Sequence, residues 1–499
     1  MEVADFYAGK NVFITGATGF IGKVLVEKLL RSTRVERVYI MMRPKKGQGL
    51  KMRWNQFIGS RVFDNIRHDP HIFDKLHAIR GDILSEGLGM SAEDRRVLED
   101  CHVVFHCAAC VKFNMFIRDA VNMNVVGTQR VLQLAENMNN LMAFIHLSTT
   151  YCRSDVSILD EQLYPSKHSP RDVIHTVTWM EYDLLKHLEE KLIHPQPNTY
   201  GYTKSLAEQL VSEYEGKFPI AIARPSIVTA SVKEPFPGWV DNLNGPTGVI
   251  VAAAKGVLRS MLCADTQHVD AMPVDLVVNG VILLACNTAI QRFVLHIHCK
   301  QAPKDIVVYN LARSNENPIT WRESIELARS QVSWYPFSVP LWYPGGSTKT
   351  SQTHHAIAVL LTHTVPAYLV DCCLVLMGNK PFLVNVHKRI NEGMKVLQYY
   401  STKSWNFNNQ RFMCLKNNIS KEEDNVFYTD PKEMHWPSYI RNYLKGAREF
   451  CCGELPETLP QARILHNRLY YLDLFVKMVL MFSLAYFVCV FSIKVYNTL

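Results

Sequence analysis

The sequence offers little support for several large classes of protein. Its 13 cysteines are odd in number and show no spacing with histidine typical of a zinc site, so neither a disulfide framework nor a metal site is expected. Lysine and arginine exceed aspartate and glutamate by only 54 to 46, a net charge of +8, which argues against a nucleic-acid partner. Residues 1–16 lack a basic region followed by an apolar core. We therefore expect no secretory signal peptide, and a reducing compartment.

The sequence does contain an alternation of short β-branched runs and helical patterns from residue 11 to about 230. The runs are NVFIT, RVYIMMR, HAIRGDI, HVVFHCAA, AFIHLSTT and IAIARPSIV. Apolar residues recur at helical spacing between them, and no internal repeat interrupts the pattern. This alternation predicts an α/β fold with a doubly wound parallel sheet of the Rossmann type.

A glycine-rich turn follows the first run. In TGATGFIG, Gly16 permits a tight turn, Gly19 lets the backbone approach a pyrophosphate, and Gly22 lets the next helix pack closely on the sheet. The N-terminus of that helix would face the anion. Because the turn joins the first strand to the first helix, it predicts a dinucleotide site rather than a purely structural turn. The candidate cofactor residues here are Gly16, Thr18, Gly19, Phe20, Ile21 and Gly22.

Basic residues follow the second run. Arg43 stands where NAD-specific folds usually place a carboxylate, and Lys45 and Lys46 come directly after it in MMRPKKGQG. An arginine there accommodates a 2′-phosphate, so the expected cofactor is NADPH; a solvated basic loop is the alternative. After the third run, Asp82 in RGDI is a candidate acceptor for the adenine amino group, and an exposed strand-end aspartate is equally consistent.

Tyr200 and Lys204 stand four residues apart in NTYGYTKSLAEQL, on a predicted helix. This spacing places both side chains on one face. A nearby ammonium stabilises a phenolate and brings the pKa of the phenol, ordinarily about 10, toward the working pH. The pair therefore predicts a general acid or base, with Lys204 also able to hold the nicotinamide ribose. Tyr202 is the rival tyrosine, but it lies on another side of the helix from Lys204.

A hydroxyl group at the end of the fifth run completes the predicted site. Ser148, Thr149 and Thr150 cluster there in HLSTTYC, and we favour Thr149 as a donor to a substrate carbonyl. Ordinary turn or cap formation is the alternative for these hydroxyls. Asn124, in AVNMNVVGTQRVL, is a candidate for ordering a water next to Lys204, and a plain helix-face asparagine is the alternative.

Two apolar stretches lie in the C-terminal part, which looks largely helical from about residue 340. Residues 478–493 are uncharged and flanked by Lys477 and Lys494. As a helix they cover about 24 Å of the roughly 30 Å hydrocarbon core, and the lysines can snorkel, so we expect a transmembrane segment rather than a buried helix. Residues 350–370 hold three histidines and Pro366. We expect a buried or membrane-surface helix there rather than a span.

Together these motifs resemble those of alcohol-forming fatty acyl-CoA reductases, within the extended short-chain dehydrogenase/reductases. The resemblance is dense over about residues 8–280, and residues 350–450, with HWPSYIRNY, are similar to that family's C-terminal domain. It implies an NADP-binding catalytic domain at 1–280, a remaining substrate region and linker at 281–345, a helical domain at 346–460 and a membrane segment at 474–494. The segments that carry it are TGATGFIGKVLVEKLLRS, RPKKGQ, FHCAACVKFN, LDEQLYP, TYGYTKSLAE, ARPSIV, KEPFPGWVDNLNGPTG and MPVDLVVN.

The resemblance implies reduction of a long-chain acyl-CoA to a primary alcohol by two NADPH, through an aldehyde that stays bound. The family's tyrosine, lysine and hydroxyl fall on Tyr200, Lys204 and Thr149, and no cysteine nucleophile is required. A membrane-attached enzyme of the peroxisome or endoplasmic reticulum is implied, with its catalytic domain in the cytosol. Cys110 and Thr150 depart from the usual threonine and alanine. Further implied cofactor residues are Ile83, Ala108, Ala109 and Pro225.

Two other functions share some of these motifs. A membrane-anchored dehydrogenase of a sterol or sugar would keep the glycine turn and the Tyr-x-x-x-Lys pair, but such enzymes usually lack the EPFPGW loop and the helical domain. A non-catalytic dinucleotide-binding sensor would be expected to lose Tyr200, Lys204 or the glycines, and all are intact. We also expect the Pro- and Gly-rich loop at residues 233–248 and the helical domain to shape a tunnel for the acyl chain.

Overall fold

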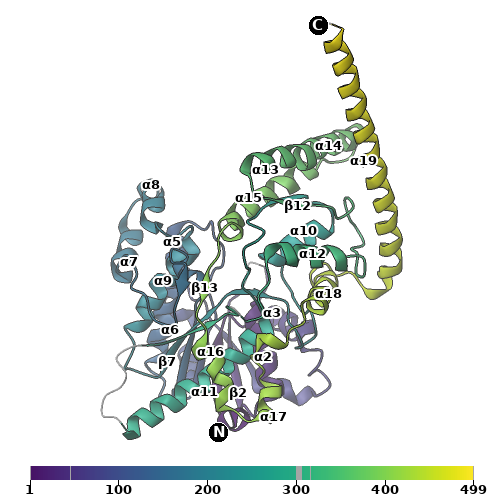
Figure 1. The fold of residues 1–499 in the computed structure, drawn as a ribbon. Helices are drawn as coiled ribbons and strands as arrows, with labels where there is room; N and C mark the ends of the chain where they lie inside the picture. Colours follow the sequence, from purple (N-terminus) through teal and green to yellow (C-terminus); the bar gives the residue numbers. More distant parts are fainter. Residues whose placement is uncertain (1, 45–46, 299–305, 315, 498–499) are drawn as a thin grey trace. The chain divides into compact units, whose positions relative to one another are not determined.

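A computed structural model describes residues 2–44, 47–298, 306–314 and 316–497 (Figure 1). The chain forms two compact units, and each is built from three separate segments. The unit that we call the sheet unit comprises Met1–Val240, Gln267–Ile319 and Lys403–His435. The helical unit comprises Asp241–Thr266, Thr320–Thr402 and Trp436–Leu499. The two units therefore alternate along the chain, whereas the boundaries expected from the sequence divide it into consecutive segments.

The sheet unit contains a seven-stranded sheet in the order β11-β7-β5-β4-β1-β2-β3, and every neighbouring pair is parallel. The order reverses at β1 and β4, which is the switch point where ligands bind in open α/β sheets. This topology confirms the predicted doubly wound α/β fold. The strands are β1 (Asn11–Thr15), β2 (Arg37–Met42), β3 (Leu76–Arg80), β4 (Val103–His106), β5 (Ala143–Leu147), β7 (Ile220–Pro225) and β11 (Val307–Leu311).

Helices cover both faces of this sheet, so its central strands are almost wholly buried, as their continuous apolar runs require. Two short parallel pairs, β8 (Ile227–Thr229) with β10 (Ala271–Pro273) and β6 (Ile158–Leu159) with β13 (Asn406–Phe407), extend the unit. The helices of the sheet unit include α1 (Val3–Phe6), α2 (Phe20–Ser32), α3 (Leu50–Ile58), α4 (Ala92–Leu98), α5 (Ile117–Val121), the π-helical η4 (Asn122–Val126), α6 (Gly127–Ala135), α7 (Pro170–Trp179), α8 (Tyr182–Ile193), α9 (Thr199–Ser212), α11 (Val274–His298), α16 (Gln410–Cys414) and α17 (Lys421–Val426).

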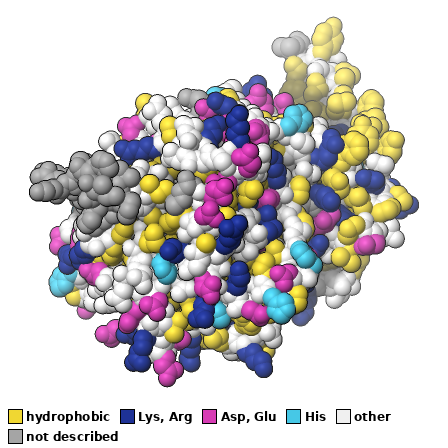
Figure 2. Space-filling view, turned by 90° about the horizontal axis from the view of Figure 1, so that it is seen from below, with side chains coloured by type: hydrophobic (Ala, Val, Ile, Leu, Met, Phe, Trp, Pro, Cys, Tyr) yellow, Lys and Arg dark blue, Asp and Glu magenta, His cyan; other side chains and the backbone are white. Residues whose placement is uncertain are grey.

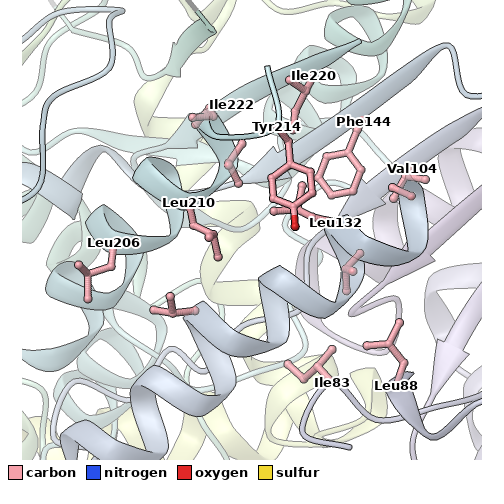
Figure 3. Close-up of a cluster of buried hydrophobic side chains, with 14 of the residues drawn as sticks. Ile83, Leu88, Val104, Leu132, Phe144, Leu206, Leu210, Tyr214, Ile220 and Ile222 are labelled. Carbon is pink, nitrogen blue, oxygen red and sulfur yellow. The ribbon is translucent and has the colours of Figure 1, made fainter. Parts of the chain in front are cut away.

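One core of the sheet unit lies between the strands and the helices α6 and α9 (Figure 3). Val104 of β4 and Phe144 of β5 meet Leu132 of α6, and Leu206 and Leu210 extend the same cluster along α9. Burying a side chain of this size contributes about 1.5–3 kcal/mol. The core therefore holds α9, which carries the predicted tyrosine and lysine, firmly against the sheet.

The helical unit consists mainly of helices, with one parallel strand pair of β9 (Ser260–Leu262) and β12 (Ser347–Lys349). Its helices confirm the predicted helical character of the C-terminal part. They include α10 (Pro246–Ala254), α12 (Trp321–Gln331), α13 (Gln352–Val359), the π-helical η6 (Leu360–Thr364), α14 (Val365–Leu376), α15 (Leu383–Ser401), α18 (Trp436–Gly446) and α19 (Leu459–Tyr496).

Among the described residues, three helical stretches are long and apolar enough to cross a membrane. Val274–Gln291, in α11, is 83% buried and belongs to the core of the sheet unit. Pro456–Tyr496, which contains α19, has no buried share in its apolar window, as expected for the C-terminal segment. Gln352–Leu376 is only 17% buried, which favours the membrane-surface helix over the buried helix, the two alternatives expected at residues 350–370.

The surface of the molecule carries both signs of charge. On the face shown in Figure 2, lysine and arginine side chains are interspersed with aspartate and glutamate. Exposed ion pairs of the sheet unit include Arg171 with Glu213 at 2.6 Å and Lys217 with Glu136 at 2.5 Å. Exposed pairs of this kind each contribute at most about 1 kcal/mol.

Candidate active site

The predicted site residues of the sheet unit follow the C-terminal ends of its strands. In a parallel sheet these ends lie along one edge, so residues distant in the sequence are brought together there. The glycine turn follows β1, Arg43 follows β2, Asp82 and Ile83 follow β3, Ala108 and Ala109 follow β4, Thr149 follows β5, and Pro225 ends β7.

The glycine turn has no space for side chains. Gly16 has a φ of +72°, and a Cβ atom there would lie 2.6 Å from the backbone nitrogen of Ala108. A Cβ on Gly22 would lie 2.4 Å from the carbonyl oxygen of Gly16. Gly19 precedes the first residue of α2 as its N-cap, so the free N–H groups of the helix open at the sheet edge. This cradle fits a pyrophosphate, and the residues present therefore suit a dinucleotide.

A buried network of polar contacts lies next to the glycine turn. The Thr15 hydroxyl lies 2.7 Å from His106 Nδ1, and His106 Nε2 lies 3.0 Å from the Thr128 hydroxyl. Burial, with a smaller effect from Lys204, lowers the pKa of His106 to about 3, so the ring is neutral. These contacts join β1, β4 and α6. Sequence reasoning missed His106, although a histidine inside the buried run HVVFHCAA was a signal.

The helix α9 presents the predicted proton-transfer pair. Its N-cap residue Asn198 accepts a hydrogen bond of 3.0 Å from the Gly201 N–H, which sets where the helix begins. Tyr200, half-buried, lies in the first turn with its ring centroid 5.6 Å from that of Phe113. Lys204 is buried, and its Nζ donates a 2.6 Å hydrogen bond to the Leu147 carbonyl at the end of β5. Burial lowers the pKa of Lys204 to about 8.

The rival tyrosine is placed elsewhere. Tyr202 is buried, and its hydroxyl lies 2.8 Å from His168 Nδ1. Burial raises the pKa of this phenol, which makes it a poor proton donor. The Tyr202 hydroxyl therefore points to His168 and not to Lys204, as expected for two residues that are only two positions apart on a helix.

A buried ion pair holds α9 against β7. Glu208 accepts hydrogen bonds of 2.8 and 2.6 Å from Nε and Nη2 of Arg224, and both side chains are almost fully buried. Glu208 also acts on Lys204, one helical turn away, and raises its pKa against the larger effect of burial. Sequence reasoning missed this pair. Two features could have indicated it: Arg224 stands inside the apolar run IAIARPSIV, and Glu208 continues the four-residue spacing of Tyr200 and Lys204.

The three hydroxyls after β5 differ in their partners. Thr149 accepts a 3.2 Å hydrogen bond from the Tyr151 N–H and so caps the short helix η5 (Thr150–Arg153). Ser148 Oγ and Thr150 Oγ1 are buried and have no hydrogen-bond partner among the described residues. A buried hydroxyl without a partner is costly unless something else binds it. Ser148 follows Leu147, whose carbonyl accepts from the Lys204 ammonium. Ser148 is therefore a candidate substrate contact in addition to Thr149.

Asn124 clamps the loop after β4. Its amide accepts a 2.8 Å hydrogen bond from the Cys110 N–H and donates to the Cys110 carbonyl at 3.2 Å and to the Thr203 hydroxyl at 2.9 Å. These contacts tie the loop to α9 without a direct bond to Lys204. Since Asn124 contacts only the backbone of residue 110, the unusual cysteine there leaves the clamp intact.

Two arginines, Arg43 and Arg53, lie close to each other after β2. Arg43 is exposed after β2, and an Nη1 atom of Arg53, from α3, donates to the Arg43 carbonyl. Burial lowers the pKa of Arg53, and the charge of Arg43 lowers it further. Lys45 and Lys46 lie outside the described residues. Asp82 is half-buried, and its carboxylate accepts a 3.1 Å hydrogen bond from the Leu84 N–H.

Cys107 and Cys110 stand at the Cys-x-x-Cys spacing of many redox pairs. Both are free thiols. A redox or nucleophilic cysteine needs a lowered thiol pKa, whereas burial raises the pKa of Cys107 to about 12. Within the described part of the chain, no group of three or more His, Cys, Asp or Glu side chains could hold a metal ion.

The EPFPGW loop is tied to the glycine turn. Trp239, almost fully buried, stacks on Phe20 at the start of α2, with ring centroids 5.5 Å apart. The carboxylate of Asp275 accepts hydrogen bonds of 2.8–3.1 Å from the backbone N–H groups of residues 232–234. Glu234 pairs with Lys28 of α2 at 2.5 Å. The loop is therefore held rigidly beside the cofactor turn by residues that sequence reasoning did not single out.

Two family models and several curated proteins match this chain. The NAD-binding domain model described as "Male sterility protein" matches residues 14–281, and a second male sterility protein model matches residues 362–454. Fatty acyl-CoA reductase 1 of Rattus norvegicus is 38% identical over 472 residues, which cover 94% of this chain and 90% of that one. Fatty acyl-CoA reductase 2 of Mus musculus is 37% identical, with 92% and 88% covered.

Solved structures share the fold at lower identity. The reductase domain of a nonribosomal peptide synthetase from Mycobacterium tuberculosis has a TM-score of 0.59 at 17% identity, covering 89% of this chain and 94% of that one. The terminal reductase domain of the myxalamid pathway has a TM-score of 0.53 at 19% identity, with 90% and 93% covered. At this identity the likeness concerns the fold.

Proposed function

The chain belongs to the fatty acyl-CoA reductase family, and from that premise we propose that it reduces a long-chain fatty acyl-CoA to the primary alcohol, using two NADPH. The observation that carries the proposal is the arrangement on α9. Tyr200 and Lys204 share one helix face, and the Lys204 ammonium is held 2.6 Å from the Leu147 carbonyl, at the same sheet edge as the glycine cradle.

The cofactor supplies a hydride when it is bound. Gly16, Gly19 and Gly22 would hold its pyrophosphate, and Lys204 its nicotinamide ribose. Arg43 and Arg53 support the choice of NADPH, because guanidinium groups close to the end of β2 favour a 2′-phosphate. Asp82 would accept from the adenine amino group.

The chain's own groups provide the rest of the chemistry. Thr149 and Tyr200 donate hydrogen bonds to the thioester oxygen, which becomes an oxyanion as hydride adds to the carbonyl carbon. The resulting hemithioacetal collapses to the aldehyde and the CoA thiolate. Hydride addition to the aldehyde then gives an alkoxide, which takes a proton from Tyr200. The Lys204 ammonium stabilises the phenolate that remains. Because hydride adds directly to the thioester carbonyl carbon, no cysteine nucleophile is needed.

Membrane attachment suits a substrate whose acyl chain is insoluble. We infer that the apolar part of α19 crosses the membrane of the peroxisome or endoplasmic reticulum, with the catalytic sheet unit in the cytosol. The apolar side chains of α19 are exposed, which supports this location.

The test is an assay of membranes that contain the full-length protein, with NADPH and a panel of saturated acyl-CoAs. We expect alcohol, with two NADPH consumed per thiol released. Tyr200→Phe should abolish alcohol formation and keep NADPH binding. Tyr202→Phe, two residues away with its hydroxyl against His168, is the matched control and should keep most activity. NADPH binding without turnover of any acyl-CoA would contradict the proposal.

A further inference from the structure

The segment that we call the apolar hairpin comprises α13, η6, α14 and α15, residues 352–401 of the helical unit. Large apolar side chains are exposed along its first arm and its turn. Several of them recur at helical spacing, so they form one stripe along the length of the helix. They are Ile357, Leu360, Leu361, Val365, Tyr368, Leu369, Val370, Val375, Leu376, Met377 and Phe382.

The turn of the hairpin is built by a buried carboxylate. Asp371, buried on α14, accepts hydrogen bonds of 3.0, 2.9 and 2.9 Å from the backbone N–H groups of Phe382, Leu383 and Val384. These are N–H groups at the start of α15 that the helix itself cannot satisfy. The carboxylate therefore locks α15 against α14 and reverses the chain after residue 377.

Both ends of the hairpin are fastened to the same strand. At the start, His355 Nδ1 lies 2.8 Å from the hydroxyl of Ser260, the first residue of β9. At the end, the Ser401 hydroxyl donates a 2.9 Å hydrogen bond to the carbonyl of Leu262, the last residue of β9. The chain thus leaves β9 and returns to it. If the first arm crossed a bilayer, α15 would have to cross it again in the opposite direction for the chain to return to β9.

The second arm is unsuited to cross back. Lys388, Arg389, Glu392 and Lys395 are exposed on α15, and Lys380 is exposed in the turn. Charged side chains facing hydrocarbon are strongly unfavourable. Four of these five charges are positive, which complements the negative surface of an anionic lipid leaflet.

The hairpin is also coupled to the membrane helix of the same unit. The Arg259 N–H donates a 2.8 Å hydrogen bond to His363 of η6, and the Arg259 guanidinium lies 3.3 Å from the Asp473 carboxylate of α19. Trp342 Nε1 donates to the same carboxylate at 2.5 Å. Asp473 comes five residues before the uncharged stretch at 478–493. The middle of the first arm is therefore linked through Arg259 to the part of α19 that would enter the bilayer.

We propose that the apolar hairpin lies flat in the leaflet that α19 enters first, with its stripe among the lipid headgroups and upper acyl chains, and does not cross the membrane. Its first arm, about 37 Å long at 25 residues, could span by length alone, but the stripe faces one side and the chain returns to β9. The hairpin is then a second attachment that fixes the tilt and rotation of the helical unit on the membrane. The proposal rests on the membrane attachment through α19 proposed above.

The test uses the full-length protein in vesicles of phosphatidylcholine and phosphatidylserine. An environment-sensitive fluorescent amino acid replaces Leu369 or Leu376 on the stripe, and nitroxide labels are placed on the lipids at shallow or deep positions. We expect shallow labels to quench both probes strongly and to similar extents. The matched control is Val339, an equally exposed apolar residue of the helical unit, where Ser338 contacts Thr458 near the start of α19. A probe at Val339 should stay unquenched.

A probe at Leu484, on the apolar part of α19, separates this inference from the proposed membrane attachment. Quenching at Leu484 by deep labels, with none at Leu369 and Leu376, would overturn the hairpin proposal alone and would indicate a protein partner on the stripe. No quenching at Leu484 would overturn both. Strong quenching of the probe at Leu376 by deep labels, with quenching of the probe at Leu369 by shallow labels, would show that the hairpin inserts into the bilayer turn first. This result would also overturn the proposal.

Discussion

Replacing Glu208 with glutamine would leave Arg224 as a buried cation without its counter-ion. Both side chains are nearly inaccessible, and the two hydrogen bonds of 2.8 and 2.6 Å form a bidentate pair. Removing one partner of a buried ion pair typically costs about 3–5 kcal/mol. Because glutamine keeps one acceptor oxygen and Arg224 also donates to the Asp160 carbonyl at 3.3 Å, we expect about 3 kcal/mol for Glu208→Gln.

At about 2.1 cal/mol/K of unfolding entropy per residue, and for a sheet unit of about 330 residues, this loss lowers the Tm of the detergent-solubilised protein by about 4 °C. The matched control is Glu213→Gln at the end of the same helix. Glu213 pairs with Arg171 at the surface, and loss of such a pair costs at most about 1 kcal/mol. Equal Tm values for the two variants would refute the argument that the buried pair holds α9 on β7.

The same substitution has a second, independent effect. The charge of Glu208 raises the pKa of Lys204 against burial, so its loss should bring that pKa below about 8. The alkaline limb of the pH–rate profile should then move to lower pH in Glu208→Gln and stay in place in Glu213→Gln. An unmoved limb in Glu208→Gln would mean that Lys204 does not control it.

Three further predictions concern the cofactor site. Gly16→Ala should abolish cofactor binding, because the new Cβ would lie 2.6 Å from a backbone atom. The control Gly216→Ala is also at positive φ but has nothing within 4 Å, so it should lower the free energy of unfolding by only about 1–2 kcal/mol and keep binding. Equal cofactor affinities of the two variants in a titration would contradict this prediction. Burial lowers the pKa of Lys204 to about 8 from 10.5, so kcat/KM should fall above about pH 8 as the ammonium is lost, and in Lys204→Arg any remaining activity should persist to higher pH. Arg43→Ala and Arg53→Ala should raise the KM for NADPH about tenfold or more and change that for NADH little; equal effects on both cofactors would argue against 2′-phosphate contacts.

Local sequence spacing predicted those parts of the site that lie within one element. Tyr200 and Lys204 share a face because four residues make about one helical turn. The glycine turn is recognisable from the spacing of its three glycines within seven residues, although the backbone that excludes a side chain at Gly16 is that of Ala108. The alternating runs predicted the parallel sheet, and with it the common edge where these motifs meet. These inferences need no knowledge of distant partners.

The missed features join residues that are far apart in the sequence. His106 contacts Thr15, 91 residues away, and Trp239 stacks on Phe20. Their roles depend on which strands become neighbours, which spacing alone does not specify. The sequence left open whether residues 350–370 are buried or lie at a membrane surface, since hydropathy measures how apolar a helix is and not what covers it.

The alternation of the two units along the chain has a consequence for the order in which the protein can be completed during synthesis. The chain passes from one unit to the other five times, and the last segment of the sheet unit, Lys403–His435, is made after most of the helical unit. No early fragment contains a finished sheet unit, and β11 itself is added about 80 residues after β7. Residues 478–493 are made later still, so every segment of the sheet unit has been synthesised before the apolar part of α19 can be delivered to a membrane.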